Sequence, residues 1–255
     1  MKILSSPAKL MRVDFHSTQL KATTPQFIKE AEKIQSHLKK KSPQFLADLM
    51  EISTKLADEN WERNQNWTAH PTPEESTNAL FAFTGEVYRG LDAPTLPPSA
   101  VEYLQKHYRM LSGLYGLLKP SDEIMLYRLE MGRPFQFEKY KNLYAFWREK
   151  ITKALNQETQ EGDIILNLAS QEYFKAVDRK KLNAKVIDFK FYDIKNGQPK
   201  TIVVYTKHAR GLVIRYCAEH QAKTLEDVKA FNYEGYLIDD EKSSDETLVF
   251  TRLSQ

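Results

Sequence analysis

Arg128 and Glu130 are two opposite charges, two residues apart, in an otherwise apolar stretch of the sequence. Side chains alternate between faces in an extended chain, so these two would share one face and Tyr127, Leu129 and Met131 the other. Charges among large apolar residues are costly unless they pair or bind a ligand. The pattern therefore predicts either a structural salt bridge at the rim of the core or a functional pair, in which Glu130 is the candidate acid or base.

Lys207 and Arg210 form a second charged group, directly before an apolar run. We predict a strand over residues 201–205 and a helix leading through residues 212–220, which places both cations in the first helical turn. The helix dipole disfavours cations at that end, while backbone N–H groups there favour an anion. The position suggests a bound phosphate, carboxylate or acidic side chain, with two solvated side chains as the alternative.

Lys9 follows a short apolar run at the start of the sequence. Residues 1–4 predict a strand, and the Ser-Ser-Pro that follows predicts the turn that ends it. Ligand-binding groups collect at strand ends in α/β sheets, so Lys9 is a candidate anion-binding residue, with a solvated surface lysine as the alternative. The run is too short, and has the wrong flanks, for a signal peptide.

Six short words occur along the chain in one order: LSSPAK, LSGLYGLLKP, YRLEMG, NLYAFW, NLASQEYFKAV and ARG before a helix. In this combination the sequence resembles the YaaA family of peroxide stress resistance proteins, from Ile3 to Arg252. The resemblance implies a cytoplasmic bacterial protein of the hydrogen-peroxide response. It also implies nucleic-acid binding through a positively charged cleft and a helix-hairpin-helix-like element. The resemblance indicates a cellular role but no particular reaction, because no enzymatic activity is firmly assigned to the family.

The composition is that of an ordinary globular protein. The chain has 255 residues, of which 41% are hydrophobic and 28% charged, and we expect one domain over residues 1–255. The net charge is only +3, so a nucleic-acid surface must be a local patch. No apolar run approaches the roughly 20 residues that cross a bilayer, so we expect no membrane contact.

The periodicities predict a mixed α/β fold (α+β in part), with a central mixed sheet, surrounding helices and an N-terminal helical hairpin. Apolar residues at helical spacing predict helices over residues 25–41, 43–67 (two helices), 99–108, 142–157 and 172–177. Strands are predicted over residues 163–168, 185–192, 199–205, 236–239 and 247–253. Asn196-Gly197 predicts a β-hairpin turn, and Thr24 is a plausible cap for the first helix.

The helical hairpin over residues 43–67 is the segment that corresponds to the family's helix-hairpin-helix resemblance. Such a hairpin normally carries glycines that let backbone N–H groups approach phosphates, but this turn has Ser53 and Thr54 and no glycine. Lys55 and Arg63 are the candidate phosphate contacts, with the two hydroxyls in support. An ordinary helical hairpin is the alternative.

A dense group of cations lies later in the chain. Within twelve residues the sequence has Arg179, Lys180, Lys181, Lys185 and Lys190. Lys180 and Lys181 are candidate DNA contacts, and Lys9, Lys207 and Arg210 can reach a common cleft if the strand ends converge. Aromatic residues nearby would suit unpaired or distorted nucleic acid, because bases stack on rings. A solvated turn is the alternative for residues 179–181 alone.

The sequence predicts no metal site and no cofactor. The six histidines, His16 among them, are dispersed without a pair at ligand spacing. No P-loop, dinucleotide-binding glycine motif or G-x-S-x-G elbow is present. Cys217 is the only cysteine, which fits a reducing compartment, and lacks a resolving partner. We expect it to be a small buried residue more than a redox sensor.

Two main hypotheses for the function follow. In the first, the protein binds duplex or distorted DNA without sequence readout, with phosphates held by Lys9, Lys207 and Arg210 and the cleft organised by Arg128 and Glu130. In the second, the same cleft holds a nucleotide, a nucleobase or another small anionic substrate of an enzyme, with Glu130 as acid or base. A protein-interaction scaffold is a third possibility. The sequence does not indicate an oligomeric state.

Overall fold

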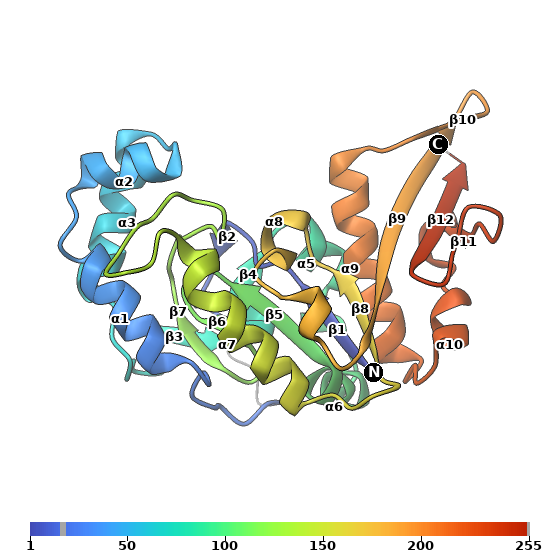
Figure 1. The fold of residues 1–255 in the computed structure, drawn as a ribbon, viewed down its shortest axis with the longest axis horizontal. Helices are drawn as coiled ribbons and strands as arrows, with labels where there is room; N and C mark the ends of the chain where they lie inside the picture. The colour runs from blue at the N-terminus through green and yellow to red at the C-terminus, as the bar shows by residue number, and fades with distance from the viewer. Residues whose placement is uncertain (16–18, 254–255) are drawn as a thin grey trace.

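The computed structural model describes residues 1–15 and 19–253, so His16 lies outside the described residues. The fold is the predicted mixed α/β globule (Figure 1). Its central sheet has eight strands. In order across the sheet these are β11 (Leu237–Ile238), β12 (Thr247–Leu253), β9 (Lys185–Lys195), β8 (Ile164–Leu168), β1 (Lys2–Ser5), β5 (Tyr108–Ser112) and β6 (Gly116–Leu118), with β10 (Gln198–Lys200) paired to β9.

Two small sheets and a set of helices complete the described part of the chain. The small sheets pair β2 (Leu10–Met11) with β4 (Phe83–Thr84) and β3 (Ser76–Asn78) with β7 (Glu123–Met125). The α-helices are α1 (Ile28–Leu38), α2 (Pro43–Met50), α3 (Thr54–Asn66), α4 (Ala79–Ala82), α5 (Glu86–Leu91), α6 (Pro98–His107), α7 (Leu143–Gln157), α8 (Gln171–Phe174), α9 (Val203–Glu219) and α10 (Leu225–Lys229). Short 3₁₀ turns are η1 (Ala93–Thr95), η2 (Arg179–Lys181) and η3 (Tyr233–Gly235).

Five strands of the central sheet are parallel, in the order β5-β1-β8-β9-β12. In chain order these are the second, first, third, fourth and fifth of the five. From β1 the chain therefore passes to β5 on one side of β1, and then crosses to β8 on the other side. A crevice forms outside the carboxyl ends of two strands at such a switch of direction, and here those strands are β1 and β8.

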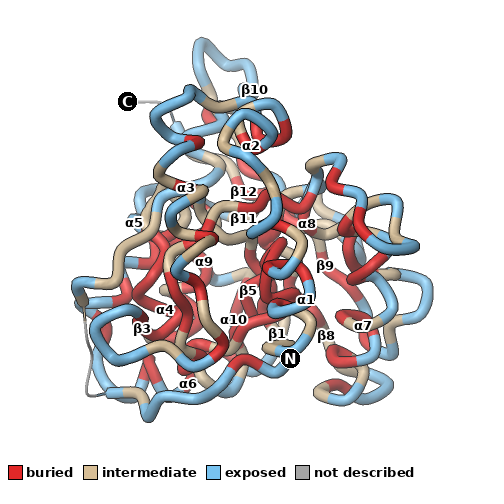
Figure 2. The backbone as a smooth tube through the Cα atoms, turned by 90° about the vertical axis from the view of Figure 1, so that its left-hand side faces the viewer, coloured by how far each residue is buried: buried red, intermediate tan, exposed pale blue. Residues whose placement is uncertain are grey.

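Helices cover both faces of this sheet. In Figures 1 and 2, α7 lies on one side and α9 on the other, and Figure 2 shows buried backbone concentrated in the sheet between them. The apolar stripe of α7 includes the fully buried Trp147 and Ile151. Its predicted start is confirmed, because the Asn142 side chain caps the helix by accepting a hydrogen bond from the Ala145 N–H at 2.9 Å.

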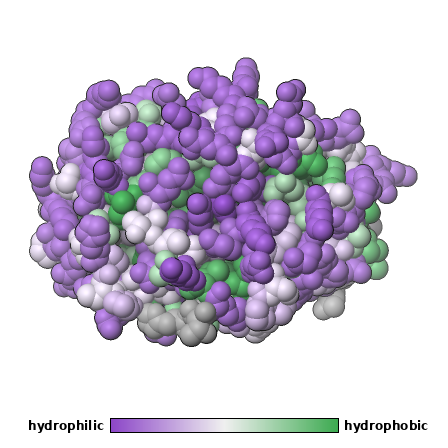
Figure 3. All heavy atoms as spheres, turned by 90° about the horizontal axis from the view of Figure 1, so that it is seen from below, coloured by the Kyte–Doolittle hydropathy of each residue, from purple (hydrophilic) through white to green (hydrophobic). Residues whose placement is uncertain are grey.

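The helical hairpin is confirmed as a pair of helices, α2 and α3, at one end of the molecule (Figure 1). Ser53 caps α3, because its hydroxyl accepts a hydrogen bond from the Leu56 N–H. On the face seen from below, hydrophilic side chains predominate and hydrophobic ones gather in small patches (Figure 3). Within residues 1–15 and 19–253, no helix combines the length and hydropathy needed to span a membrane.

The structure corrects two local predictions. Residues 201–205 are not a strand: β10 ends at Lys200 and α9 begins at Val203, so Lys207 and Arg210 lie beyond the first turn of the helix. The β-branched run Thr-Ile-Val-Val favours a strand locally, but its last two residues begin α9, a long helix that packs against α5. Thr24 is not the cap of α1, which begins at Ile28 after Phe27, so the first three residues of the predicted helix lie in a turn.

Cys217 has the predicted buried position. It is fully buried in α9, and burial raises the pKa of its thiol to about 12. A thiol in this state is a poor nucleophile at neutral pH. The side chain therefore acts as a small packing residue in the core.

Candidate functional site

A pocket of about 430 Å³ lies outside the carboxyl ends of β1 and β8, where the strand order reverses. Ser6 and Ser170 join the loops that leave these strands: the Ser170 N–H donates to the Ser6 hydroxyl at 2.8 Å, and the two hydroxyls lie 3.2 Å apart. The Tyr88 hydroxyl donates to the Ser6 carbonyl oxygen at 3.0 Å. These bonds fix the floor of the pocket at the switch point of the sheet.

The pocket brings together five of the residues singled out in the sequence. Its lining includes Lys9, Arg128, Glu130, Lys207 and Arg210. They come from three separate segments: the loop after β1, the extended stretch after β7, and α9. The predicted convergence of the strand ends with α9 is therefore what the fold produces.

The extended stretch that carries Arg128 and Glu130 is held by backbone packing against the loop after β5. A Cβ atom at Gly113 would overlap the Leu129 carbonyl oxygen, so only glycine permits this approach. The hydroxyls of Ser112 and Tyr127 share a hydrogen bond of 2.6 Å beside it. Tyr127 and Leu129 are buried and the two charged side chains lie together on the other side, as alternation predicts.

The helix that carries Lys207 and Arg210 is held by a second close approach. A Cβ atom at Gly211 would overlap the Val87 carbonyl oxygen of α5, and one at Gly90 would overlap the His208 carbonyl oxygen of α9. The two helices are thus in backbone contact. Arg210 and the α5 residues Glu86, Val87 and Tyr88 all line the pocket.

Glu130 is the centre of an ion cluster. Its side chain is only 7% exposed, and Lys9 Nζ lies 2.9 Å and Arg128 Nη2 3.6 Å from its Oε1. Arg133 Nε lies 3.2 Å from its Oε2. Burial acts to raise the pKa of Glu130, but the three cations together hold this pKa below its usual value. The carboxylate is therefore ionised at neutral pH, which suits a base or an organising charge better than an acid.

Lys207 and Arg210 have no hydrogen-bond or ion-pair partner among residues 1–15 and 19–253. Lys207 is exposed, whereas Arg210 is partly buried and its Nε is fully buried without a partner. Burial lowers the pKa of Arg210, and no carboxylate opposes this. The site therefore holds two cations whose charge the protein itself does not neutralise.

A larger groove of about 1,810 Å³ adjoins the pocket, and Arg210 lines both. Its lining has nine cationic side chains and three carboxylates. The cations are Lys141, Arg148, Lys153, Lys175, Arg179, Lys180, Lys181, Lys190 and Arg210; the carboxylates are Glu149, Asp178 and Asp188. Lys180 and Lys181 are therefore in the groove, and Lys185 is not part of its lining.

Lys55 and Arg63 lie on α3, outside the lining of both hollows. Arg63 Nη1 donates to the Asn60 side chain at 3.3 Å. The hairpin does reach the pocket through another residue: Glu51, which ends α2, has its Oε2 2.9 Å from Arg133 Nη1. Arg133 in turn contacts Glu130, so the hairpin and the pocket are joined by one chain of charges.

Sequence reasoning missed three contributors to the site: Arg133, and the pair Ser6 and Ser170. Arg133 lies three residues after Glu130, a spacing that could have marked it as a partner. The two serines occur in LSSPAK and NLASQEYFKAV, but only the pairing of β1 with β8 shows that they meet. For the described ranges, no group of three or more histidine, cysteine, aspartate or glutamate side chains is placed to hold a metal ion.

The fold and the site define an α/β protein with a cationic pocket at the carboxyl ends of its parallel strands. A family model described as "Peroxide stress protein YaaA" matches residues 1–242. A UPF0246 protein of Flavobacterium johnsoniae is 47% identical over 252 residues, covering 99% of this chain and 100% of the relative. A UPF0246 protein of Neisseria meningitidis serogroup B is 45% identical over 257 residues, covering 100% and 99%. The chain belongs to the YaaA family of peroxide stress proteins.

Proposed function

We propose that this protein binds DNA in the cytoplasm during peroxide stress, holding duplex or distorted DNA in the basic groove without reading its sequence. The observation that carries the proposal is the charge of the groove, with nine cations against three carboxylates, continued by Arg210 into the pocket. The molecule as a whole carries only +3, so this charge is local. Local cationic surfaces attract the phosphate backbone by releasing its counterions.

Most of the groove cations are free to meet phosphates. Arg179 is engaged with Asp188 at 2.6 Å and with Glu246 at 3.2 Å, and Arg148 lies 3.5 Å from Asp178. The six lysines of the lining have no carboxylate within 4 Å in the described part of the chain. Aromatic side chains in the same lining, such as Tyr144 and Phe174, are partly exposed and offer rings to unpaired bases.

The hairpin contributes auxiliary contacts in this proposal. Lys55 and Arg63 would meet phosphates through their side chains, because a turn without glycine does not present its N–H groups in the usual way. Replacement of both by alanine should weaken binding less than replacement of groove lysines. Equal losses from the two pairs would show that the hairpin is part of the main contact surface.

Fluorescence anisotropy with duplex, bubbled and junction DNA over a salt series tests the proposal. We expect affinity to fall steeply with salt, and the double variant Lys180→Ala/Lys181→Ala to reduce the slope of log K against log[salt] by about 2. The matched control is Lys106→Ala, an exposed lysine in the last turn of α6 with its own partner, Glu102. Absence of binding at low salt, or equal effects of control and groove variants, would overturn the proposal.

A second candidate function is an enzyme that acts on a nucleotide, a nucleobase or another small anion in the pocket. The volume of about 430 Å³ is within the range of small-molecule sites, and the ionised Glu130 lies in the lining. Glu130→Gln distinguishes the two functions. The change should leave DNA affinity largely intact if the protein only binds, and should abolish turnover of a small substrate if it is an enzyme.

A further inference from the structure

The pocket has a second set of features, apart from its charge, that narrows the class of ligand it would hold. It lies at the switch point between β1 and β8, where the connecting loops leave toward opposite sides. Ligands of open α/β sheets bind in crevices of this kind. Position alone says nothing of ligand chemistry, so the class must come from the side chains that line the pocket.

The charges of the pocket leave room for an anion with two negative charges. Four cations and three carboxylates line it, but two of the carboxylates already have cationic partners: Glu86 with Arg89 at 2.8 Å, and Glu130 with its own cluster. Lys207 and Arg210 remain unpaired within the described ranges. A phosphate monoester suits this pair, because a guanidinium donates two parallel hydrogen bonds to phosphate and an ammonium adds a point charge.

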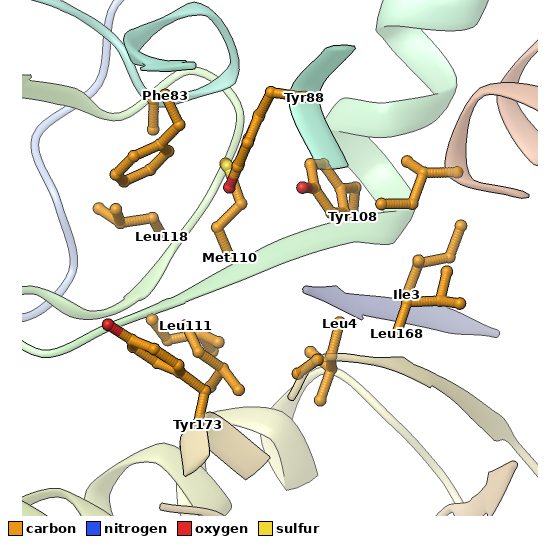
Figure 4. Packing of buried hydrophobic residues seen from close by; sticks show 14 of the residues in the cluster. Ile3, Leu4, Phe83, Tyr88, Tyr108, Met110, Leu111, Leu118, Leu168 and Tyr173 are labelled. Carbon is orange, nitrogen blue, oxygen red and sulfur yellow. The ribbon is translucent and has the colours of Figure 1, made fainter. Parts of the chain in front are cut away.

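One wall of the pocket is apolar and aromatic, which a bare inorganic anion does not use. Leu10 is 68% exposed at the rim although it is a large hydrophobic residue. Val87 and Leu129 line the interior beside the rings of Tyr88 and Tyr173. Figure 4 shows these two tyrosines reaching toward β5 from opposite sides of the strand. A flat ring placed against this wall would bury the exposed apolar surface of Leu10 and contact the outer atoms of the largely buried Leu129, Tyr88 and Tyr173.

The lining of the pocket also includes hydrogen-bonding groups. The hydroxyls of Ser6 and Ser170 line the pocket, and so does the exposed Glu172. Glu172 accepts the Gly132 N–H on Oε1 at 2.9 Å. Its Oε2 has no partner in the described part of the chain and is available to accept a hydroxyl or an amino group. The pocket thus presents cations, polar oxygens and an apolar wall within one volume.

We infer that the pocket is a binding site for one nucleoside monophosphate unit, with its phosphate on Arg210 and Lys207 and its base against the wall formed by Leu10, Val87 and Leu129. This deepens the proposed small-ligand function of the pocket and does not depend on DNA binding by the groove. The unit can come from two sources that share this chemistry: a free nucleotide, or a single unpaired nucleotide of a strand in the groove. Arg210 lines both hollows, so it can serve either source.

Isothermal titration calorimetry tests the inference by measuring the affinity of the full chain for deoxyadenosine 5′-monophosphate, deoxyadenosine and inorganic phosphate. We expect the monophosphate to bind at least about tenfold more tightly than either fragment, because both parts of the pocket then contribute. Lys207→Ala should weaken binding of the monophosphate by about tenfold and leave the fold intact, since the Lys207 side chain is exposed and unpaired within the described ranges. Arg210→Lys keeps the charge but removes the two-pronged contact, and should also weaken it.

The matched control is Lys180→Ala/Lys181→Ala, which alters the groove and not the pocket. This double variant should leave binding of the monophosphate unchanged while it weakens binding of DNA. Competition separates the two sources: excess monophosphate should displace bubbled DNA in part, and intact duplex not at all, if an unpaired nucleotide of the strand enters the pocket. If bubbled and duplex DNA are equally unaffected, the site serves the free nucleotide.

Three results would overturn the inference while leaving DNA binding untouched. They are no heat of binding at millimolar monophosphate, inorganic phosphate binding as tightly as the monophosphate, and unchanged binding by the Lys207 and Arg210 variants. Conversely, if no DNA in the anisotropy series binds and the monophosphate binds normally, only the groove proposal is refuted. The two proposals can therefore fail separately.

Discussion

The two ends of strand β1 handle charge in opposite ways. At its amino end, which we call the closed end, the cations are held in ion pairs. The Met1 amino group lies 3.1 Å from Asp163, and Glu158 pairs with both Lys2 at 3.0 Å and Arg109 at 2.8 Å. Burial acts to raise the pKa of Glu158, but the two cations hold this pKa below its usual value. In this ion network each of the three cations has a carboxylate partner, although the two carboxylates do not fully neutralise them.

The carboxyl end of β1 is different. One carboxylate, Glu130, is shared by three cations, and Lys207 and Arg210 have no partner in the described residues. The same strand thus joins a region whose charges stabilise the fold to a region whose charges are open to an incoming anion. Arg210 is partly buried without a counter-charge, and this difference between the two ends is the reason for our proposal that an anion binds at the carboxyl end.

The largest expected effect comes from breaking the closed end. Glu158→Ala leaves Lys2 and Arg109 in a mostly buried position without a counter-charge. We expect the free energy of unfolding to fall by about 3–4 kcal/mol, measured by urea denaturation. Glu102→Ala, which breaks an exposed pair with Lys106, is the control and should cost about 0.5 kcal/mol or less. Similar losses in both variants would show that the network adds no stability of its own.

A buried carboxylate without a cation gives the next effect. Asp122 has no cation within 4 Å among the described residues, and burial raises its pKa to about 6, although it accepts hydrogen bonds from the Lys119 N–H and the Thr23 hydroxyl. The folded state then binds the proton more tightly than the unfolded chain, whose aspartate pKa is about 3.9, so stability falls as pH rises from about 4 to 6. The two pKa values differ by about two units, so we expect this loss to reach about 3 kcal/mol above pH 6.

Unfolding of Asp122→Asn across the same pH range measures this contribution. The variant has no titrating group at this position, so its stability should lack the decline between pH 4 and 6 that the wild type shows. Parallel curves for the two proteins would mean that the carboxyl stays ionised despite its burial.

The smallest effect is expected at the open end. Three cations hold the pKa of Glu130 below its unfolded value although burial acts to raise it, so the folded state favours its ionised form. Its contribution is fully present above about pH 5 and is lost as pH falls through the lowered folded pKa. We expect Glu130→Gln to cost about 1 kcal/mol at pH 7, because its charge is partly offset by the cost of burial.

Two measurements on Glu130→Gln distinguish the open end from the closed one. The stability difference from the wild type should shrink when unfolding is measured below pH 4. At pH 7, affinity for an anion in the pocket should rise several-fold, since the cation surplus grows by one. A loss of stability as large as that of Glu158→Ala would mean that the two ends are equivalent.

Some of this site could be predicted from the sequence. Alternation along residues 127–131 places Arg128 and Glu130 on one face, and the fold places them so. A helix dipole argument selected Lys207 and Arg210, and both line the pocket, although the reasoning rested on a first turn that they do not occupy. The prediction remains useful because two cations without a local partner indicate a ligand at any position of the helix.

The rest depended on long-range pairing. The order β5-β1-β8 joins residues more than a hundred positions apart, and it alone makes Ser6 and Ser170 neighbours. The ion pair of Glu51 with Arg133 spans 82 positions and has no local pattern. Residues 201–205 show the opposite problem, because their β-branched run predicts a strand, whereas in the structure they lead into α9.

The glycine contact between α5 and α9 has a consequence for engineering. The separation of α5 from α9 is set by peptide backbone touching peptide backbone at Gly90 and Gly211, without a layer of interdigitating side chains between them. The backbone of α5, which carries Tyr88, is therefore held as close to that of α9, which carries Arg210, as two peptide chains can approach. Libraries that randomise the wall at Leu10, Val87 and Leu129 can reshape the specificity of the pocket while its width is preserved, provided that both glycines are kept.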